Sequence, residues 1–284
     1  MTTIGDRAAS ITIAEALADA RAAGLDRTDA MLLLGHHLQR PRGWLIAHDD
    51  APLAAADAQA YAALCRRRAD GEPVAYLLGQ REFHGLALEV TPDVLVPRPD
   101  TETLVDWALE LLPADTTAQV ADLGTGSGAI ALALAAARPG ARLLATDLSA
   151  AAITVAQRNA LRLDLAPQVQ WAQGAWWQPV PPDARFGLVV SNPPYIAGDD
   201  PHLPALRHEP RLALTPEGDG LGALREIVGG ASAHLAVGAW LLLEHGYDQA
   251  EAVRALLSQA GFSSIASRRD LGGQWRCSGG RWST

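Results

Sequence analysis

The first part of the chain carries apolar residues at the spacing of helices. Over residues 11–69 they recur every three or four positions, which gathers them on one face of each helix. The pattern is interrupted at Gly24 and at residues 41–43, where a glycine or a Pro-x-Gly sequence occurs. This pattern predicts a small helical bundle, which we expect to form a separate domain over residues 1–75.

An alternating segment follows the helical part. Residues 83–90 alternate in polarity, which predicts a short β-hairpin, and we expect the hairpin to lie in a connector over residues 76–98. Asp100 comes next, just before an amphipathic pattern over residues 101–112. Because Asp is a preferred N-cap residue, we expect Asp100 to cap a helix there.

Short apolar runs then alternate with helical patterns to the end of the chain. This alternation predicts an α/β fold with a Rossmann-like, doubly wound parallel sheet over residues 99–284. The tail has two strand-like runs around Gly272-Gly273, and it predicts an antiparallel hairpin at the sheet edge. The runs expected to form parallel strands are residues 119–123, 142–146, 169–172, 187–191 and 239–244.

One connection between these elements is unusually long. Residues 196–220 show no clear periodicity and include four prolines. Compact domains seldom keep a long structureless connection unless it covers or recognises a ligand. We therefore expect this segment to face the substrate.

Composition and charge limit the kinds of partner. Of the 284 residues 49% are hydrophobic, which is enough for a folded core. The formal net charge is −9, and all 23 basic residues are Arg. Binding through many phosphate contacts needs clustered basic residues, so we expect no direct nucleic-acid partner.

The cysteines and histidines point away from disulfides and metals. Cys65 and Cys277 lie far apart and form no CxxC pair, which favours a reducing cytoplasm. The histidines lack the spacing of metal ligands, so we expect no metal. No apolar segment approaches the length of a membrane span, and we expect no membrane partner.

The first chemical motif is Asn192-Pro193-Pro194-Tyr195, which follows the apolar run 186–191. The two prolines remove two backbone donors and fix two φ angles, so the carbonyl groups become rigid acceptors. The Asn side chain adds a further acceptor and two donors, and the Tyr ring adds a flat wall. This combination suits a planar group that bears an NH₂, either an amide or the exocyclic amine of a base.

The second motif is a glycine-rich turn after an earlier strand. The turn, Gly124-Thr125-Gly126-Ser127-Gly128, leads into a helix of strong helix formers, and Asp147 ends the next strand. Glycines allow close approach to a ligand, and a carboxylate at that strand end can accept hydrogen bonds from a ribose. Alone, the turn also fits an NAD site. The Asn-Pro-Pro-Tyr motif further along favours a methyltransferase that uses S-adenosyl-L-methionine.

The chain resembles the PrmC or HemK family of protein-(glutamine-N5) methyltransferases, which modify class 1 peptide chain release factors. The resemblance covers nearly all of the chain and is weakest in the first seventy or so residues. It implies that Asn192 and Pro193 hold the glutamine amide of a Gly-Gly-Gln motif, with Pro194 and Tyr195 beside it. The matching segments, besides the two motifs, are residues 71–76, 81–85, 95–102 and 242–246.

The resemblance also assigns residues around the cofactor. It implies that Gly124 to Gly128, Asp147 and Asn192 contact S-adenosylmethionine and that Trp176 lines the adenine pocket. The family usually has Asp just before that Trp, but this chain has Ala175, which leaves the adenine amine without that acceptor. In the family Arg98 and Glu102 flank the site, although a local helix-cap pair is an equally good interpretation.

Two alternatives remain open at this point. A DNA or RNA amino-methyltransferase shares Asn-Pro-Pro-Tyr, but it would need a basic groove and a base-flipping pocket. A module that only binds a nucleotide would not need an intact motif at residues 192–195. We expect a monomeric, cytoplasmic enzyme that acts in translation termination.

Overall fold

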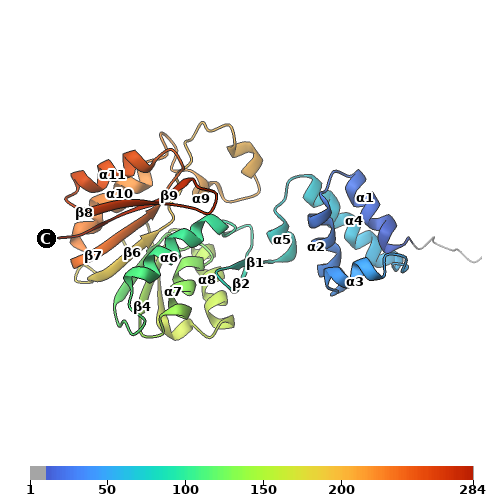
Figure 1. The fold of residues 1–284 in the computed structure, drawn as a ribbon, viewed down its shortest axis with the longest axis horizontal. Coiled ribbons are helices and arrows are strands. Elements are labelled where there is room, and N and C mark those ends of the chain that lie inside the picture. The colour runs from blue at the N-terminus through green and yellow to red at the C-terminus, as the bar shows by residue number, and fades with distance from the viewer. Residues whose placement is uncertain (1–10, 284) are drawn as a thin grey trace, which may run out of the picture. The chain divides into compact units, whose positions relative to one another are not determined.

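The structure is a computed structural model that describes residues 11–283. It divides into two compact units, of which the first ends at Gly79 and the second begins at Gln80. The described part of the first unit, residues 11–79, contains helices and no strand (Figure 1). They are α1 (Ile13–Ala22), α2 (Arg27–Leu38), α3 (Arg42–Ala47), α4 (Ala55–Ala69) and α5 (Val74–Leu78).

The helical unit forms because caps fix its helix starts and one apolar cluster holds it together. Thr12 and Glu15 form a capping box at α1, and the Asp26 side chain accepts from two backbone N–H groups of α2. Leu33 and Leu34 are fully buried in the cluster, and the Tyr61 hydroxyl donates to the Ala30 carbonyl at 3.0 Å. The predicted helical bundle is therefore confirmed.

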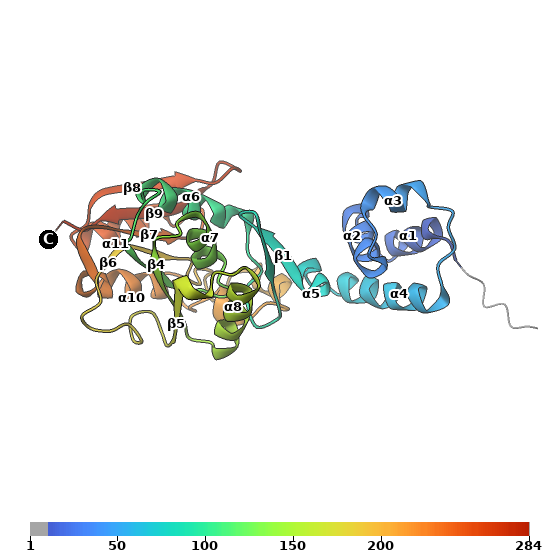
Figure 2. The same ribbon diagram turned by 90° about the horizontal axis from the view of Figure 1, so that it is seen from below.

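The second unit begins with the predicted hairpin, formed by β1 (Gln80–Phe83) and β2 (Leu86–Glu89). Its sheet has seven strands in the order β5-β4-β3-β6-β7-β9-β8 (Figures 1 and 2). The parallel strands are β3 (Gln119–Leu123), β4 (Arg142–Asp147), β5 (Val169–Gln173), β6 (Phe186–Ser191) and β7 (Leu235–Glu244). The strands β8 (Ser263–Arg269) and β9 (Trp275–Arg281) form the predicted antiparallel hairpin at the edge.

Helices cover both faces of this sheet. One apolar cluster joins α6 (Glu102–Leu111) and α7 (Ala129–Ala137) to the sheet, and it also takes in Ala160 from α8 (Ala150–Arg162). A second cluster joins α10 (Gly222–Gly230) and α11 (Ala250–Gln259) to β3, β6 and β7. The predicted α/β, doubly wound architecture is confirmed.

Chain order reverses at β3, whose neighbours are β4 on one side and β6 on the other. In open α/β sheets, ligands bind at the carboxyl ends of the strands where the order reverses. Leu123 at the end of β3 is in register with Thr146 and with Ser191. The segments that follow β3, β4 and β6 therefore begin next to one another.

Two local predictions differ from the structure. Asp100 does not cap a helix, because Pro99–Thr101 form a turn of 3-10 helix and α6 begins only at Glu102, without a side-chain cap. The Asp100 carboxylate instead lies 3.5 Å from the Arg276 guanidinium. The segment 196–220 is not wholly irregular either, since it contains a 3-10 turn (Leu203–Leu206) and the short helix α9 (Arg211–Leu214).

The remaining short elements of the described chain are turns of 3-10 helix. They cover Ala166–Gln168, just before β5, and Ala231–Ala233, just before β7.

Candidate active site

A cavity of about 430 Å³ lies at the carboxyl ends of the central strands. Residues 124–127, 147–149 and 174–176 line it from the segments after β3, β4 and β5. Asn192 and Pro194 line it after β6, and five residues between 210 and 216 also contribute. Most of the sequence-predicted site residues therefore surround one cavity.

The glycine-rich turn is held by backbone bonds and packs against an aromatic ring. Gly124 and Thr125 donate their backbone N–H groups to the Thr146 carbonyl, each at 2.9 Å. Gly124 has φ of +77°, and a Cβ there would lie 3.1 Å from the Trp176 ring, so only glycine fits this position without strain. Thr125 and Gly126 of this turn line the cavity together with Asp147.

Asp147 ends β4 and faces the glycine-rich turn. Its Oδ2 accepts from the backbone N–H of Gly126 at 2.9 Å, and its Oδ1 accepts from that of Ser149 at 2.8 Å. Burial raises the pKa of this carboxyl, while the backbone hydrogen bonds lower it. Each carboxylate oxygen can accept more than one hydrogen bond, so the group can also accept from two adjacent hydroxyls.

Asp122 is a site residue that the sequence reasoning missed. It is fully buried, and its Oδ2 accepts from the Thr125 hydroxyl at 2.7 Å and from the Ala131 backbone N–H at 3.2 Å. Burial raises its pKa to about 7, and Oδ1 has no hydrogen-bond partner. Asp122 therefore holds the glycine-rich turn and the start of α7 in place. In the sequence, a single carboxylate within an otherwise apolar strand could have indicated this residue.

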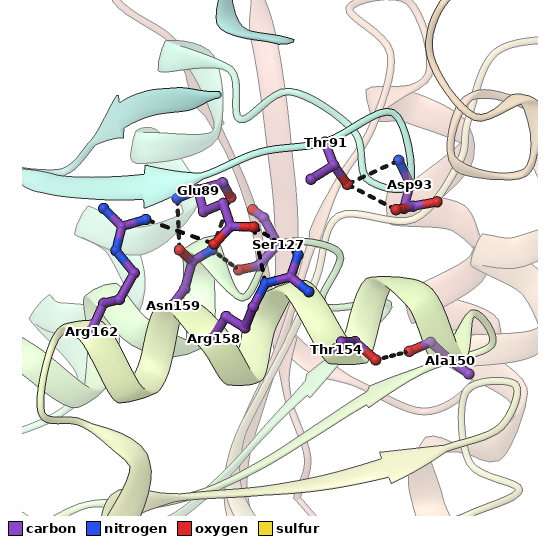
Figure 3. A network of polar contacts seen from close by, with 9 residues as sticks. All are labelled: Glu89, Thr91, Asp93, Ser127, Ala150, Thr154, Arg158, Asn159 and Arg162. Atoms are coloured by element: carbon purple, nitrogen blue, oxygen red, sulfur yellow. Dashed lines mark hydrogen bonds and ion pairs between the residues drawn. The ribbon is translucent and has the colours of Figure 1, made fainter. Parts of the chain in front are cut away.

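Asn159 on α8 is a second residue that the sequence reasoning missed (Figure 3). Its Nδ2 donates to the Ser127 carbonyl at 2.9 Å and to the Glu89 carbonyl at 3.0 Å, and its Oδ1 accepts from the Glu89 N–H at 2.6 Å. The Arg158 side chain pairs with the Glu89 carboxylate on the outside. Asn159 thus ties the glycine-rich turn to strand β2.

The Asn192–Tyr195 segment is anchored by side chains from several elements. The Asn192 Nδ2 donates to the Thr101 Oγ1 at 3.2 Å. The Tyr195 hydroxyl donates to Glu244 Oε1 at 3.2 Å, and Gln249 Nε2 donates to the Tyr195 carbonyl at 2.9 Å. With its amide nitrogen engaged, Asn192 has its carbonyl oxygen left as an acceptor.

Three predicted residues do not line the cavity. Pro193 is buried, and Gly128 packs against α8, where a Cβ would lie 3.1 Å from the Ala156 side chain. Tyr195 holds the segment through its hydroxyl, and burial raises the pKa of that hydroxyl. The predicted contacts of Pro193 and Tyr195 with an acceptor amide stay predictions.

The two tryptophans after β5 have different surroundings. Trp176 has φ of +45° and lines the cavity beside Gly124. Trp177 does not line it; its Nε1 donates to the Ile227 carbonyl at 2.9 Å, and its ring stacks on His234 at 5.1 Å. Trp176 is therefore the one of the pair that can contact a bound ligand.

Arg98 and Glu102, the two polar residues expected to flank the site, each contact another part of the fold. Arg98 lines the cavity and forms an ion pair with one carboxylate oxygen of Glu209. The other Glu209 oxygen accepts from the Val96 backbone N–H at 3.1 Å. Glu209 therefore connects residues 95–98 to the long segment after β6. Glu102 accepts from the His84 backbone N–H at 3.0 Å.

His245 is not positioned as a base. Its Nε2 lies 2.7 Å from the Ser278 hydroxyl and its Nδ1 lies 2.8 Å from the Gly246 carbonyl, so both ring nitrogens have partners. Burial lowers the pKa of this imidazole, and His245 does not line the cavity. The strand-end histidine is therefore satisfied within the fold.

Within residues 11–283, no group of three or more His, Cys, Asp or Glu side chains could hold a metal ion. In the same part of the chain, no helix has both the length and the apolar character needed to cross a membrane.

The sheet order and the cavity define a methyltransferase fold. Residues 102–219 match the methyltransferase small domain family. A crystal structure of a methyltransferase from Pyrococcus furiosus superimposes with a TM-score of 0.54 at 19% identity, over 70% of this chain and 90% of that one.

The likeness to one methyltransferase family extends over nearly the whole chain. Residues 11–79 match the PrmC N-terminal domain family. The release factor glutamine methyltransferase of Bordetella pertussis is 53% identical over 259 residues, or 90% of this chain and 95% of the relative. That of Burkholderia pseudomallei is 53% identical over 268 residues, or 92% and 94%. The chain belongs to the release factor glutamine methyltransferase family and is a methyltransferase.

Proposed function

We propose that this protein transfers a methyl group from S-adenosyl-L-methionine to the side-chain amide nitrogen, N5, of the glutamine in the Gly-Gly-Gln motif of class 1 peptide chain release factors. The observation that carries the proposal is the engagement of the Asn192 Nδ2 with Thr101 beside the cavity. This contact leaves the Asn192 carbonyl as an acceptor for an amide N–H. The family likeness supplies the identity of the acceptor.

The residues around the cavity fit the methyl donor. Asp147 retains acceptor capacity for the two ribose hydroxyls, and Trp176, which lines the cavity, provides a flat apolar ring for adenine. Ala175 lines the cavity without an acceptor side chain, so the adenine amine must be recognised by another group. When bound, S-adenosylmethionine supplies an electrophilic methyl group on its sulfonium.

The task of the protein side chains is geometric. An amide nitrogen is a weak nucleophile because its lone pair is delocalised into the carbonyl. If Asn192 Oδ1 and the Pro193 carbonyl each accept one N–H of the acceptor amide, one face of the nitrogen is held toward the cavity. Holding reactants in such a near-attack arrangement lowers the barrier by several kcal/mol. The fixed acceptors also stabilise the positive charge that develops on nitrogen.

No strong base is needed in this scheme. The amide proton becomes acidic once the nitrogen carries the methyl group, and it can pass to solvent. This agrees with the satisfied state of His245, whose two ring nitrogens contact Ser278 and Gly246.

The partner in this function is a class 1 release factor, and the compartment is the cytoplasm. The helical unit, residues 11–79, would bind the release factor at a surface other than the acceptor glutamine. Net charge −9 supports a protein acceptor without direct nucleic-acid binding, and the buried free thiols of Cys65 and Cys277 suit the cytoplasm. We expect a monomer.

The alternative acceptor is a base amine, since Asn-Pro-Pro-Tyr also suits an exocyclic NH₂. The test supplies labelled cofactor with purified release factor, its Gln→Ala variant, and duplex or single-stranded DNA. One methyl on the glutamine of the unmutated factor alone would support the proposal. Label on DNA at a comparable rate, or equal label on the Gln→Ala factor, would overturn it.

A further inference from the structure

A carboxylate from helix α10 lines the cavity at the carboxyl ends of the strands. Glu226 is exposed and lines the cavity together with Gly222 and Ala223 of the same helix. Residues three and four positions apart lie on one face of a helix, so these positions form the side of α10 that faces the cavity. Leu224 and Ile227, on the other side of α10, are buried in the apolar core.

Helix α10 packs directly against the segment after β5. The Trp177 Nε1 donates to the Ile227 carbonyl at 2.9 Å, and a side chain at Gly230 would clash with the Trp177 ring. Glu226 directly precedes Ile227, and Ala175 lies two positions before Trp177. This contact therefore brings Glu226 and Ala175 to the same side of the cavity, which both of them line.

The carbonyl groups of residues 175–177 already have partners. The Ala175 carbonyl accepts from a backbone N–H at 2.9 Å, and the Trp177 carbonyl accepts from another at 3.0 Å. The Trp176 carbonyl accepts from the Thr146 hydroxyl at 3.4 Å. By contrast, the Glu226 side chain forms no hydrogen bond or ion pair with any residue of the range 11–283. Its two oxygens are therefore available to a ligand on this side of the cavity.

A carboxylate suits the exocyclic amine of adenine. The amine donates two hydrogens in the plane of the base, and an ionised carboxylate only accepts. A hydrogen bond to an ionised group is also stronger than one between two neutral groups. The family usually supplies this carboxylate from an Asp directly before Trp176, where this chain has Ala175. Glu226 offers the same chemistry from a different helix.

We propose that Glu226 is a specificity-determining residue that accepts a hydrogen bond from the exocyclic amine of the adenine of S-adenosylmethionine. It would take the place of the Asp that the family usually has at position 175. The proposal rests on the proposed function, which places adenine against Trp176. A purine with a carbonyl oxygen at that position would be repelled by the carboxylate, so Glu226 would select for adenine.

The first test measures cofactor-site affinity by titration calorimetry with two ligands. One is S-adenosylhomocysteine, and the other is its analogue with hydrogen in place of the adenine amine. Because solvent competes for an exposed hydrogen bond, the wild type should bind the analogue about fivefold more weakly, and Glu226→Ala should bind both ligands equally. An amine preference that is the same in the two proteins would overturn the proposal. Equal losses for both ligands in Glu226→Ala would also overturn it, since Glu226 would then act on another part of the cofactor.

Two further variants make the comparison specific. Glu251→Ala removes an exposed carboxylate on α11 that does not line the cavity, and it should keep the wild-type amine preference. Adding Ala175→Asp to the Glu226→Ala protein returns a carboxylate to the position that the family uses. This double variant should regain a preference for the amine of about fivefold. A double variant that binds both ligands equally would contradict an amine site beside Ala175 and Glu226.

The calorimetric test needs no release factor, so it is separate from the test of the proposed function. A wild type that methylates the release factor glutamine but binds the two ligands equally would overturn the role of Glu226 alone. A wild type that prefers the ligand with the amine but transfers no methyl to the release factor would support the role of Glu226 and overturn the proposed acceptor.

Discussion

Leu123 at the end of β3 is in register with Ser191 at the end of β6. The glycine-rich turn that follows Leu123 and the Asn192–Tyr195 segment that follows Ser191 therefore start side by side, although they lie far apart in the sequence. The Ser191 hydroxyl strengthens this junction by donating to the Leu123 carbonyl at 2.6 Å. One pair of neighbouring strands thus brings the predicted cofactor residues to the predicted acceptor residues.

Replacing Asp147 by Ala should weaken the binding of S-adenosylmethionine much more than it slows methyl transfer at saturating cofactor. Hydrogen bonds to a charged group are worth about 1.5–3 kcal/mol each, so we expect a loss of about tenfold or more in affinity. Titration calorimetry measures it, with Asp183→Ala on the exposed loop before β6 as a matched control. Unchanged affinity in Asp147→Ala would remove Asp147 from the cofactor site.

Replacing Asn192 by Ala should nearly abolish turnover while the fold persists. Loss of one oriented polar group from a preorganised site lowers the rate by about 10²–10³. Single-turnover assays at saturating cofactor measure this, and calorimetry should find a smaller loss of cofactor affinity. A variant that keeps half of the wild-type rate would contradict the role of Asn192.

Asp122 should make stability depend on pH. Burial raises its folded-state pKa to about 7, so the folded protein binds this proton more tightly than the unfolded chain does. The free energy of unfolding should therefore fall as pH rises from about 4, the unfolded pKa, to about 7. Urea unfolding across this range should give a shallower fall for Asp122→Asn, which keeps an acceptor for Thr125. Identical slopes would disprove the assignment.

Asn159→Ala should destabilise the second unit and weaken cofactor binding. The change leaves the Ser127 carbonyl and the Glu89 backbone groups without their partner, at a cost of about 1–3 kcal/mol in the free energy of unfolding. Arg158→Ala on the same helix removes only a half-exposed ion pair, and it should cost less than about 1 kcal/mol. Chemical denaturation compares the two, and equal losses would contradict a special role for Asn159.

The sequence by itself determined the course of the sheet. An apolar run such as residues 186–191 indicates a strand that is buried on both faces. The glycines after residues 119–123 indicate a tight turn. Both can be recognised in the sequence because they depend only on neighbouring residues. The Asn192–Tyr195 motif and Asp147 stand out for the same reason, since each directly follows or ends a strand. The general location of the candidate site therefore needed no tertiary information.

The Asp100 prediction shows where local reasoning failed. Asp before an amphipathic run is a typical N-cap, but Pro99 starts a 3-10 turn, and the carboxylate lies near Arg276 from β9. Arg276 lies near the other end of the chain, so no pattern around Asp100 predicts that the two side chains meet.

Tertiary structure alone decided which polar groups meet. Asn192 reaches Thr101 across 91 positions, Tyr195 reaches Glu244 across 49, and Asn159 reaches the Glu89 backbone across 70. Hydrophobic periodicity indicates which face of an element is buried, but it does not specify the partner of a buried polar atom. That partner depends on strand order and register, which are set by packing over the whole sheet.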